Sequence, residues 1–410
     1  MKILILSRST THHITSGGME THLKNLAEGL ADKQNQVDIL TTAHPDHLEN
    51  NFELIEAGVA YHFIGSTTPG LYPLYAWEKL FYKLGLLNRG SIKEGSLSFF
   101  EQSRLIFGSL YEKHKFDVVV SQSTGAYGIY ENLSIPLVVI IHGTIKTEIQ
   151  NRWQSIKSFK NYVRFLGVDI FKWAYEFVIE NKKFFEKTSK IIAVSNQLRK
   201  DFLQDFSELE NKVVVIPNGV DEKIFRPADA AEKYKKFTLL YVGRMEIEKG
   251  VDILINAVTE IKDKNFEILL IGDGIHTGYF KELTRQLNLK DKVKFLGKIA
   301  NNDLAEYYRK SHVFVLPSRR IEGHPMTVSE AMCSGLPILS TRSGGLKDLF
   351  EDGKEGFFIE DKDSLAEKIK LLIDDKDMLA ELSSNSYKKG IQSYSKDAMI
   401  SKYISCLNSL

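Results

Sequence analysis

The chain has 410 residues, and its 54 Lys and Arg face 53 Asp and Glu, so the formal net charge is only +1. The balance also holds locally, because residues 1–220 carry 24 basic and 23 acidic side chains. Phosphate neutralisation needs clustered Lys and Arg, so this composition argues against a nucleic-acid partner. The length and the apolar fraction of 43% predict a globular protein of two domains.

The sequence gives no sign of export or of membrane insertion. The two cysteines, Cys333 and Cys406, cannot form a disulfide framework, and neither has the Cys/His spacing of a zinc site. The first apolar run, 3–6, is too short for a signal peptide, and no stretch approaches the ~18 apolar residues of a membrane span. We therefore expect a cytoplasmic protein.

Short aliphatic runs, each followed by small or polar residues, recur along the first half of the chain. They are 2–7, 37–41, 117–121, 137–141, 190–194 and 213–216. Such runs are typical of buried parallel strands. The segment 19–30 repeats apolar residues every three or four positions, which predicts a helix between the first two strands.

The same alternation starts again after the turn at 217–221. Strands are predicted at 238–242, 267–271, 292–296, 313–316 and 337–340, and helices at 364–373, 376–390 and 396–407. Alternating strands and helices predict an α/β fold of two Rossmann-like, doubly wound domains facing each other across a cleft. We place the first domain at 1–220, the second at 221–390 and a closing helix within 391–410.

Two cations flank the predicted start of a helix in the second domain. Arg244 follows the strand at 238–242, and Lys249 comes just before the predicted helix at 251–261. Together with the free amides of the helix start they could neutralise a diphosphate. Two solvated side chains beside a turn are the alternative, and these residues alone do not separate the two.

Two glutamates eight positions apart, Glu322 and Glu330, lie in a predicted loop and in the helix that follows it. Pro325 suits the first helical position, which would leave the amides of Met326 and Thr327 free to point at an anion. Surface glutamates are the alternative, but the apolar sequence that follows predicts a packed region.

Two further residues are expected at the carboxyl ends of first-domain strands. Gly18 lies between the first strand and the first helix, where glycine permits close approach of a ligand, although a plain tight turn is the alternative. His142 ends the strand at 137–141 and could bind a hydroxyl or assist proton transfer, unless it is a structural histidine.

These motifs occur in order along nearly the whole chain and are specific as a set. They are Gly17-Gly18-Met19-Glu20, His142-Gly143, the segment 215–221, Gly243-Arg244 with Lys249-Gly250, and the block 322–330. The set resembles the retaining glycosyltransferases of family 4, which have the B-type glycosyltransferase (GT-B) fold.

The resemblance implies a metal-independent transferase that moves a hexose or N-acetylhexosamine from a UDP-sugar or GDP-sugar to a glycan or lipid-linked acceptor. It implies no metal and no other cofactor. A nucleotide-sugar epimerase of the same fold, or a non-catalytic nucleotide-sugar-binding scaffold, remains an alternative.

The resemblance also implies a role for each matched residue. Arg244 and Lys249 would hold the donor diphosphate in place of magnesium. Glu322 would contact the donor sugar, and Glu330 the ribose. Of these, Arg244, Lys249 and Glu322 are predicted to be catalytic as well as donor-binding.

In the first domain the resemblance brings Gly18 to the diphosphate and His142, as a catalytic residue, to the transferred sugar. It also implies that the closing helix crosses back to this domain.

One part of the donor loop departs from the pattern of many family members. They read Glu-x-Phe-Gly, whereas this chain has His324 and Pro325 in place of the aromatic residue and the glycine. Proline has no amide to donate, so one contact of the family is lost there. We assign His324, Met326 and Thr327 to donor binding, in a form similar to that of polysaccharide-building bacterial members.

The acceptor side is marked only by composition. Two first-domain stretches, 71–116 and 152–185, are rich in aromatic residues: Trp77, Phe81, Tyr82, Trp153, Phe159, Phe165, Phe171 and Trp173. From 146 to 190, ten bases oppose five acids. Basic helices with aromatic residues can lie on an anionic membrane, so peripheral contact with its inner face is one hypothesis. Ordinary core and cleft-lining helices are the slightly favoured alternative.

Overall fold

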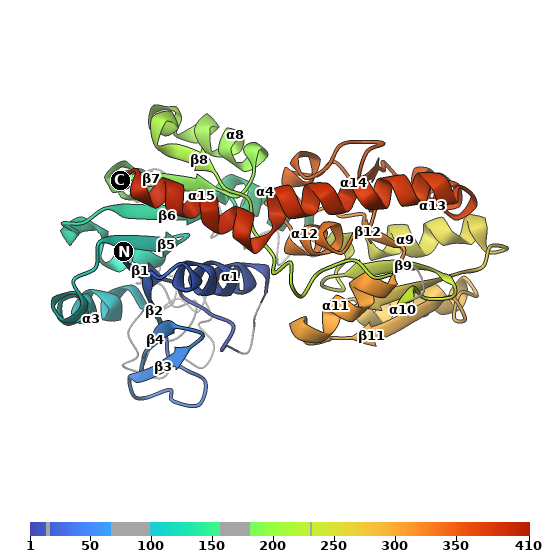
Figure 1. Ribbon diagram of the computed structural model, residues 1–410. Coiled ribbons are helices and arrows are strands. Elements are labelled where there is room, and N and C mark those ends of the chain that lie inside the picture. Colours follow the sequence, from blue (N-terminus) through green and yellow to red (C-terminus); the bar gives the residue numbers. More distant parts are fainter. Residues whose placement is uncertain (14–16, 67–98, 156–180, 230–231) are drawn as a thin grey trace.

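The computed structural model describes residues 1–13, 17–66, 99–155, 181–229 and 232–410. They form two α/β domains, each built on one sheet with helices packed against it, which lie side by side (Figure 1). The predicted fold class is therefore confirmed. Within these residues, no helix combines the length and the apolar character needed to cross a membrane.

The first domain contains an eight-stranded sheet in the order β3-β4-β2-β1-β5-β6-β7-β8. Its strands are β1 (Lys2–Leu6), β2 (Gln36–Thr42), β3 (Phe52–Glu56), β4 (Val59–Ile64), β5 (Val118–Gln122), β6 (Leu137–Ile141), β7 (Lys190–Ala193) and β8 (Val213–Val215). The main helices are α1 (Gly18–Asp32), α3 (Phe99–His114), α4 (Ile145–Ser155), α7 (Lys182–Lys187) and α8 (Asn196–Asp205). Only β3 runs antiparallel to its neighbour.

The second domain has a fully parallel sheet in the order β11-β10-β9-β12-β13-β14. Its strands are β9 (Phe237–Val242), β10 (Phe266–Ile271), β11 (Val293–Gly297), β12 (Val313–Leu316), β13 (Ile338–Ser340) and β14 (Gly356–Phe358). The helices are α9 (Val251–Ala257), α10 (Thr277–Gln286), α11 (Asn301–Lys310), α12 (Met326–Cys333), α13 (Lys362–Asp374) and α14 (Lys376–Tyr394). The last helix of the chain, α15 (Lys396–Asn408), packs on the first domain.

All the predicted strands are present, and their ends differ from the prediction by at most one residue. Three further strands, β3, β4 and β14, were not predicted. Of these, β3 exposes much of its surface and so lacks the continuous apolar run of a buried strand. The prediction of an α-helix at 251–261 is wrong for the second half of that range. The α-helix α9 ends at Ala257, and a 3-10 turn covers Val258–Ile261, as is common where an α-helix ends.

The strand order reverses between β1 and β5 in one sheet and between β9 and β12 in the other. In open parallel sheets, ligands bind beyond the carboxyl ends of the strands at such a reversal. The helices α1 and α9 follow β1 and β9 directly, so their first residues lie at these two points.

The chain passes between the domains twice, and the two crossings bond to each other. The Val220 amide donates to the Tyr394 carbonyl at 2.9 Å, and the Lys396 amide donates to the Val220 carbonyl at 2.7 Å. Beyond this contact α15 lies across the first domain, while α14 covers the second (Figure 1). The apolar residues Met399 and Tyr403 of α15 belong to the core of the first domain.

Two helical glycines give a matched test of how tightly α15 packs. A Cβ on Gly29 of α1 would lie 2.5 Å from Ile400 Cγ1 of α15, whereas a Cβ on Gly108 of α3 would meet nothing within 4 Å. Gly29→Ala should therefore lower the free energy of unfolding by about 1–3 kcal/mol through overpacking. Gly108→Ala should raise it by about 0.5–1 kcal/mol, because alanine favours the helix. Urea unfolding of both variants checks the pair, and equal effects would contradict the packing.

Candidate functional site

One pocket of about 630 Å³ lies between the two domains, at the carboxyl ends of both sets of strands. Its volume is typical of a small-molecule site. All nine residues predicted from the sequence line it: Gly18, His142, Arg244, Lys249, Glu322, His324, Met326, Thr327 and Glu330. The structure therefore brings together residues that lie up to 312 positions apart, from Gly18 to Glu330.

A largely buried ion pair lines this pocket. The Lys249 ammonium donates to Glu322 Oε1 at 2.7 Å, and the Ser318 hydroxyl donates to the same oxygen at 2.7 Å. Burial alone would raise the pKa of Glu322, but the Lys249 charge and these hydrogen bonds hold the pKa below its ordinary value. Glu322 is therefore an anion, and it accepts a hydrogen bond from one N–H group of Lys249.

Two local features place Lys249 there. The residue ends a 3-10 turn, and Gly250 follows with a φ of +73°, a backbone conformation that favours glycine. A Cβ on Gly250 would also lie 1.9 Å from the Pro317 carbonyl oxygen at the end of β12. A glycine is thus required for α9 to start against β12 with Lys249 facing the pocket.

Arg244 is the more accessible of the two predicted cations. Its side chain is 57% exposed, and Nη1 donates to Glu246 Oε1 at 2.8 Å. An exposed pair of this kind contributes little to stability, so the guanidinium can turn toward an anion without a large cost. The sequence did not indicate that Glu246 would pair with Arg244.

The starts of two helices face the same space, α1 from the first domain and α12 from the second. Gly17, Gly18 and Met19 line the pocket on one side, and Met326 and Thr327 on the other. Helix starts carry unpaired amides and partial positive charge.

The expectation that Pro325 takes the first helical position is wrong. Its backbone is extended, with ψ of 117°, and it precedes α12 as the cap residue, so the helix starts at Met326.

Glu330 has an environment very different from that of Glu322. It is buried in α12, and the Tyr308 hydroxyl donates to its Oε2 at 2.7 Å. Burial without a cationic partner raises the pKa of Glu330 to about 7. The carboxyl group therefore changes charge near neutral pH.

His142 ends β6 and lines the pocket beside Gln122 of β5. Its Nε2 lies 2.6 Å from Gln122 Oε1, an acceptor, so Nε2 carries the proton and Nδ1 can accept. Burial lowers the pKa of His142 to about 4. The imidazole is therefore neutral over the range in which most enzymes work, and it can accept a hydrogen bond from a hydroxyl group.

The imidazole of His324 joins the domains instead of offering a nitrogen to a ligand. Nδ1 donates to the Val194 carbonyl of the first domain at 3.1 Å, and Nε2 accepts from the Ser329 hydroxyl at 2.8 Å. Burial lowers the pKa of His324 to about 3. Next to it, a Cβ on Gly323 would lie 2.3 Å from the His142 carbonyl oxygen, so only glycine allows the two backbones to meet here.

A smaller pocket of about 190 Å³ opens from the same place toward α4 and α8. His142, Glu322 and Gly323 line both pockets. The remaining lining is mostly polar: Gly143, Thr147, Glu148, Asn151, Gln197, Leu198, Asp201, Arg320, Ile321 and Gly345. The two pockets are therefore neighbours that share His142, Glu322 and Gly323 in their walls.

Sequence reasoning missed several residues of the site. Lys298 lines the large pocket just after β11, where the strand-end rule could have found it. Asn218 also lines the pocket, and its amide donates to the His324 carbonyl at 3.2 Å. Tyr308 and Ser318 hold the two glutamates, and no spacing in the sequence indicates either contact.

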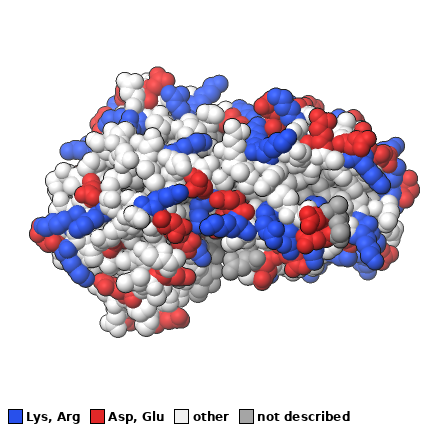
Figure 2. Space-filling view, viewed as in Figure 1, with Lys and Arg blue, Asp and Glu red and all other residues white. Residues whose placement is uncertain are grey.

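Most of the aromatic residues predicted for the acceptor side lie outside the described residues. These are Trp77, Phe81, Tyr82, Phe159, Phe165, Phe171 and Trp173. Trp153 of α4 is described and is half-exposed. Over the face shown in Figure 2, acidic and basic side chains intermingle on both domains, which agrees with the even charge of the sequence.

Comparisons with known proteins match the whole length of the chain. The family model described as Glycosyltransferase Family 4 matches residues 16–223, and the model described as Glycosyl transferases group 1 matches residues 222–389. An uncharacterized glycosyltransferase of Methanocaldococcus jannaschii is 25% identical over 402 residues, which cover 93% of this chain and 91% of that protein.

Solved structures share the fold. Sucrose-phosphate synthase from Thermosynechococcus elongatus aligns with a TM-score of 0.76 at 20% identity, covering 100% of this chain and 98% of that one. The Anabaena protein HepE, solved in complex with UDP and glucose, aligns with a TM-score of 0.68 at 22% identity over 100% of both chains. None of these matches supports the epimerase alternative.

The raised pKa of Glu330 predicts a pH-dependent stability. A carboxyl group with a pKa of about 7 in the folded protein, against 4.5 ordinarily, binds its proton more tightly when folded. Its contribution is therefore full below about pH 4.5 and is lost as the pH rises through 7. Relative to Glu330→Gln, the wild type should lose about 3 kcal/mol of unfolding free energy over this range.

Urea unfolding at several pH values measures the difference between the two proteins. Glu367→Gln, at a solvent-facing position of α13, controls for loss of a surface carboxylate. A wild type and Glu330→Gln that keep a constant difference from pH 5 to 8 would show that Glu330 is not held in this way.

Proposed function

The chain belongs to the family 4 glycosyltransferases, and from that premise we propose a retaining, metal-independent hexosyltransferase. It would move a hexose or N-acetylhexosamine from a UDP-sugar or GDP-sugar to a glycan or lipid-linked acceptor. One observation carries the proposal: two cations and two helix starts converge on a pocket that also contains the buried Glu322.

The donor diphosphate would lie between the two domains. Arg244 and Lys249 supply positive charge from one side, and the amides at the start of α1 and α12 supply hydrogen bonds from both. The complex of the Anabaena relative with UDP and glucose supports a uridine donor as the first candidate.

The two glutamates of the pocket would bind the ribose and the transferred sugar of the donor. Glu330, deeper in α12, would accept hydrogen bonds from the ribose hydroxyls, and Glu322 would hold the hydroxyls of the transferred sugar. The acceptor would then enter by the smaller polar pocket, because that pocket meets the larger one at His142 and Glu322.

The reaction would proceed on one face of the sugar. The bond from the anomeric carbon to the diphosphate oxygen breaks as the bond to the acceptor oxygen forms, and the acceptor proton passes to the departing diphosphate. Arg244 and Lys249 stabilise the charge that grows on the diphosphate, as preorganised groups do in an anion hole. The neutral His142 accepts a hydrogen bond from a hydroxyl and orients the reacting groups.

This arrangement needs no metal ion at the diphosphate, because fixed cations take its place. In the described part of the chain, the side chains grouped closely enough to hold a metal lie outside the pocket. We therefore expect turnover to persist in the presence of a chelator.

Arg244→Ala should lower kcat by 10² to 10³, or about 3 kcal/mol, because it removes one charge from the transition state. The fold should stay intact, since Arg244 forms only an exposed ion pair. Arg285→Ala is the matched control: this side chain is also 57% exposed and pairs with a neighbouring glutamate, Glu282, at 2.5 Å. Near wild-type turnover for Arg244→Ala would contradict the role of Arg244 in stabilising the diphosphate.

Product analysis tests the reaction itself. The chain is incubated with UDP- and GDP-sugars, a chelator and candidate acceptors, and release of the nucleoside diphosphate is followed. We expect release to rise with one donor when an acceptor is added, and the new glycosidic bond to keep the donor's α configuration by NMR. An inverted product would contradict retention, and a sugar epimerised without an acceptor would contradict transfer.

Peripheral membrane contact stays a separate proposal. It rests on the excess of bases over acids between 146 and 190, together with the aromatic residues of the same stretch. Co-sedimentation with anionic vesicles at low salt is expected and should weaken as salt is added. If the protein does not sediment with the vesicles, the membrane proposal is contradicted and the acceptor is one that the protein meets in solution.

A further inference from the structure

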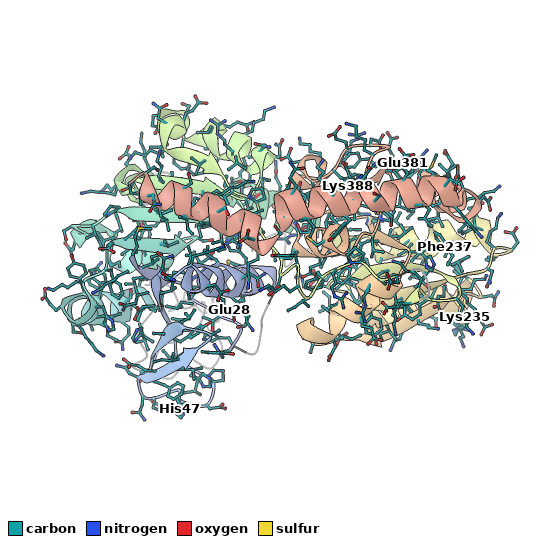
Figure 3. The ribbon with its side chains drawn as sticks, in the orientation of Figure 1. Glu28, His47, Lys235, Phe237, Glu381 and Lys388 are labelled. Carbon is teal, nitrogen blue, oxygen red and sulfur yellow. The ribbon has the colours of Figure 1, made fainter. Side chains whose placement is uncertain are left out.

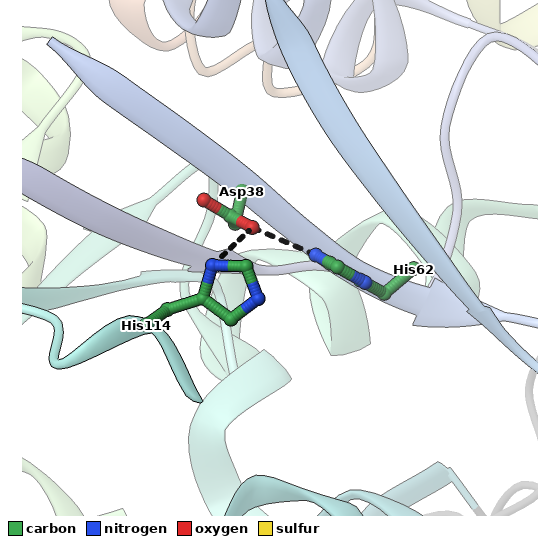
Figure 4. A group of neighbouring side chains, drawn as sticks. All are labelled: Asp38, His62 and His114. Carbon is green, nitrogen blue, oxygen red and sulfur yellow. Dashed lines mark hydrogen bonds and ion pairs between the residues drawn. The ribbon is translucent and has the colours of Figure 1, made fainter. Parts of the chain in front are cut away.

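A second cluster of polar side chains lies in the first domain, outside the pocket. Asp38 of β2, His62 of β4 and His114 at the end of α3 converge on one point (Figure 4). Asp38 is fully buried in β2, between the buried residues Val37 and Ile39. A buried carboxylate needs strong partners, so its presence in this core calls for an explanation that the transferase site does not provide.

The distances within the cluster suit a metal ion. Asp38 Oδ1 lies 2.7 Å from His62 Nε2 and 3.6 Å from His114 Nδ1, and all three atoms lie within 4.8 Å of one another. Ligand atoms around a tetrahedral zinc ion are roughly 3.4 Å apart, given bonds of about 2.0–2.2 Å. Small side-chain shifts would therefore bring all three atoms to zinc.

The surroundings orient both histidines for this role. The Nδ1 of His62 lies 3.1 Å from Glu53 Oε1, so a carboxylate fixes the ring while Nε2 faces the cluster. Metal-binding histidines commonly have such a carboxylate on their second nitrogen. The Gln36 side-chain amide donates to Asp38 Oδ2 and to His114 Nδ1, each at 3.1 Å, so it would have to turn away for Nδ1 to bind an ion.

The charge and burial of the cluster also fit a divalent cation. Asp38 and Glu53 carry two negative charges, which one such ion would balance. His114 and Gln36 lie toward the surface and give the ion a path of entry.

We propose that Asp38, His62 and His114 bind one zinc ion, with water as the fourth ligand. The bound ion would tie β2, β4 and the end of α3 together. Asp38 lies in the amino-terminal half of β2, and His114 just precedes β5, so the ion would lie away from the carboxyl-end pocket. Two imidazoles and a carboxylate are ligands that favour zinc over magnesium or calcium.

The experiment uses the full chain, stripped of metal with a chelator and then dialysed. Zinc is titrated by calorimetry, and thermal unfolding is followed with and without zinc. We expect one zinc per chain, a melting temperature that rises with zinc concentration, and cobalt absorption bands typical of four-coordinate geometry. Glu53→Gln should weaken zinc binding roughly 10- to 100-fold, as loss of such a partner typically does.

His114→Gln should abolish this binding, and its melting temperature should not respond to zinc. His47→Gln is the matched control, because His47 is an exposed histidine at the outer tip of the same domain and outside the cluster (Figure 3). Zinc binding that is equal in wild type and His114→Gln, or absent from both, would overturn the site and leave an ion-paired network. The experiment measures zinc binding and not turnover, so its result does not depend on whether the transferase proposal is right.

Discussion

The contact between the two chain crossings is the constraint on which the site depends. Backbone hydrogen bonds join Val220 to Tyr394 and Lys396, and the Asn25 side chain of α1 donates to the Gly219 carbonyl at 2.9 Å. Buried backbone groups are costly to leave unpaired, so these bonds fix where the second domain begins. Together with the bridge from His324 to Val194, they hold the strand ends of both sheets toward one pocket.

Within that pocket, two glutamates of similar burial acquire opposite properties. Lys249 lowers the pKa of Glu322, whereas Glu330 has only the neutral Tyr308 hydroxyl and its pKa rises to about 7. The hydrogen-bonding partner alone therefore decides whether a buried carboxylate in this site stays charged or titrates near neutral pH. The fixed anion at Glu322 also limits the net positive charge that Lys249 brings to the pocket.

The sequence was most informative where local rules decide the structure. Buried parallel strands are continuous apolar runs, so β1, β6 and β12 could be located within a residue or two. The strand-end rule then placed Arg244 and His142 at the pocket before any geometry was known.

Contacts between distant segments could not be predicted in this way. Nothing near His324 in sequence indicates that its ring reaches Val194, and nothing near Arg244 shows that Glu246 would hold it. The cluster of Asp38, His62 and His114 spans 76 positions without a recognisable spacing, and it becomes visible only when β2, β4 and α3 are packed. Such arrangements depend on tertiary structure, because short-range propensity carries no information about them.

Calorimetric titration with UDP and with GDP, in the presence of a chelator, tests most directly whether the pocket is a metal-free diphosphate site. We predict that one nucleoside diphosphate binds once per chain to the wild type, and that the same titration of Arg244→Ala shows a large loss of affinity. Binding that appears only when a divalent metal is added, or no binding of either nucleotide, would contradict the use of fixed cations in this pocket.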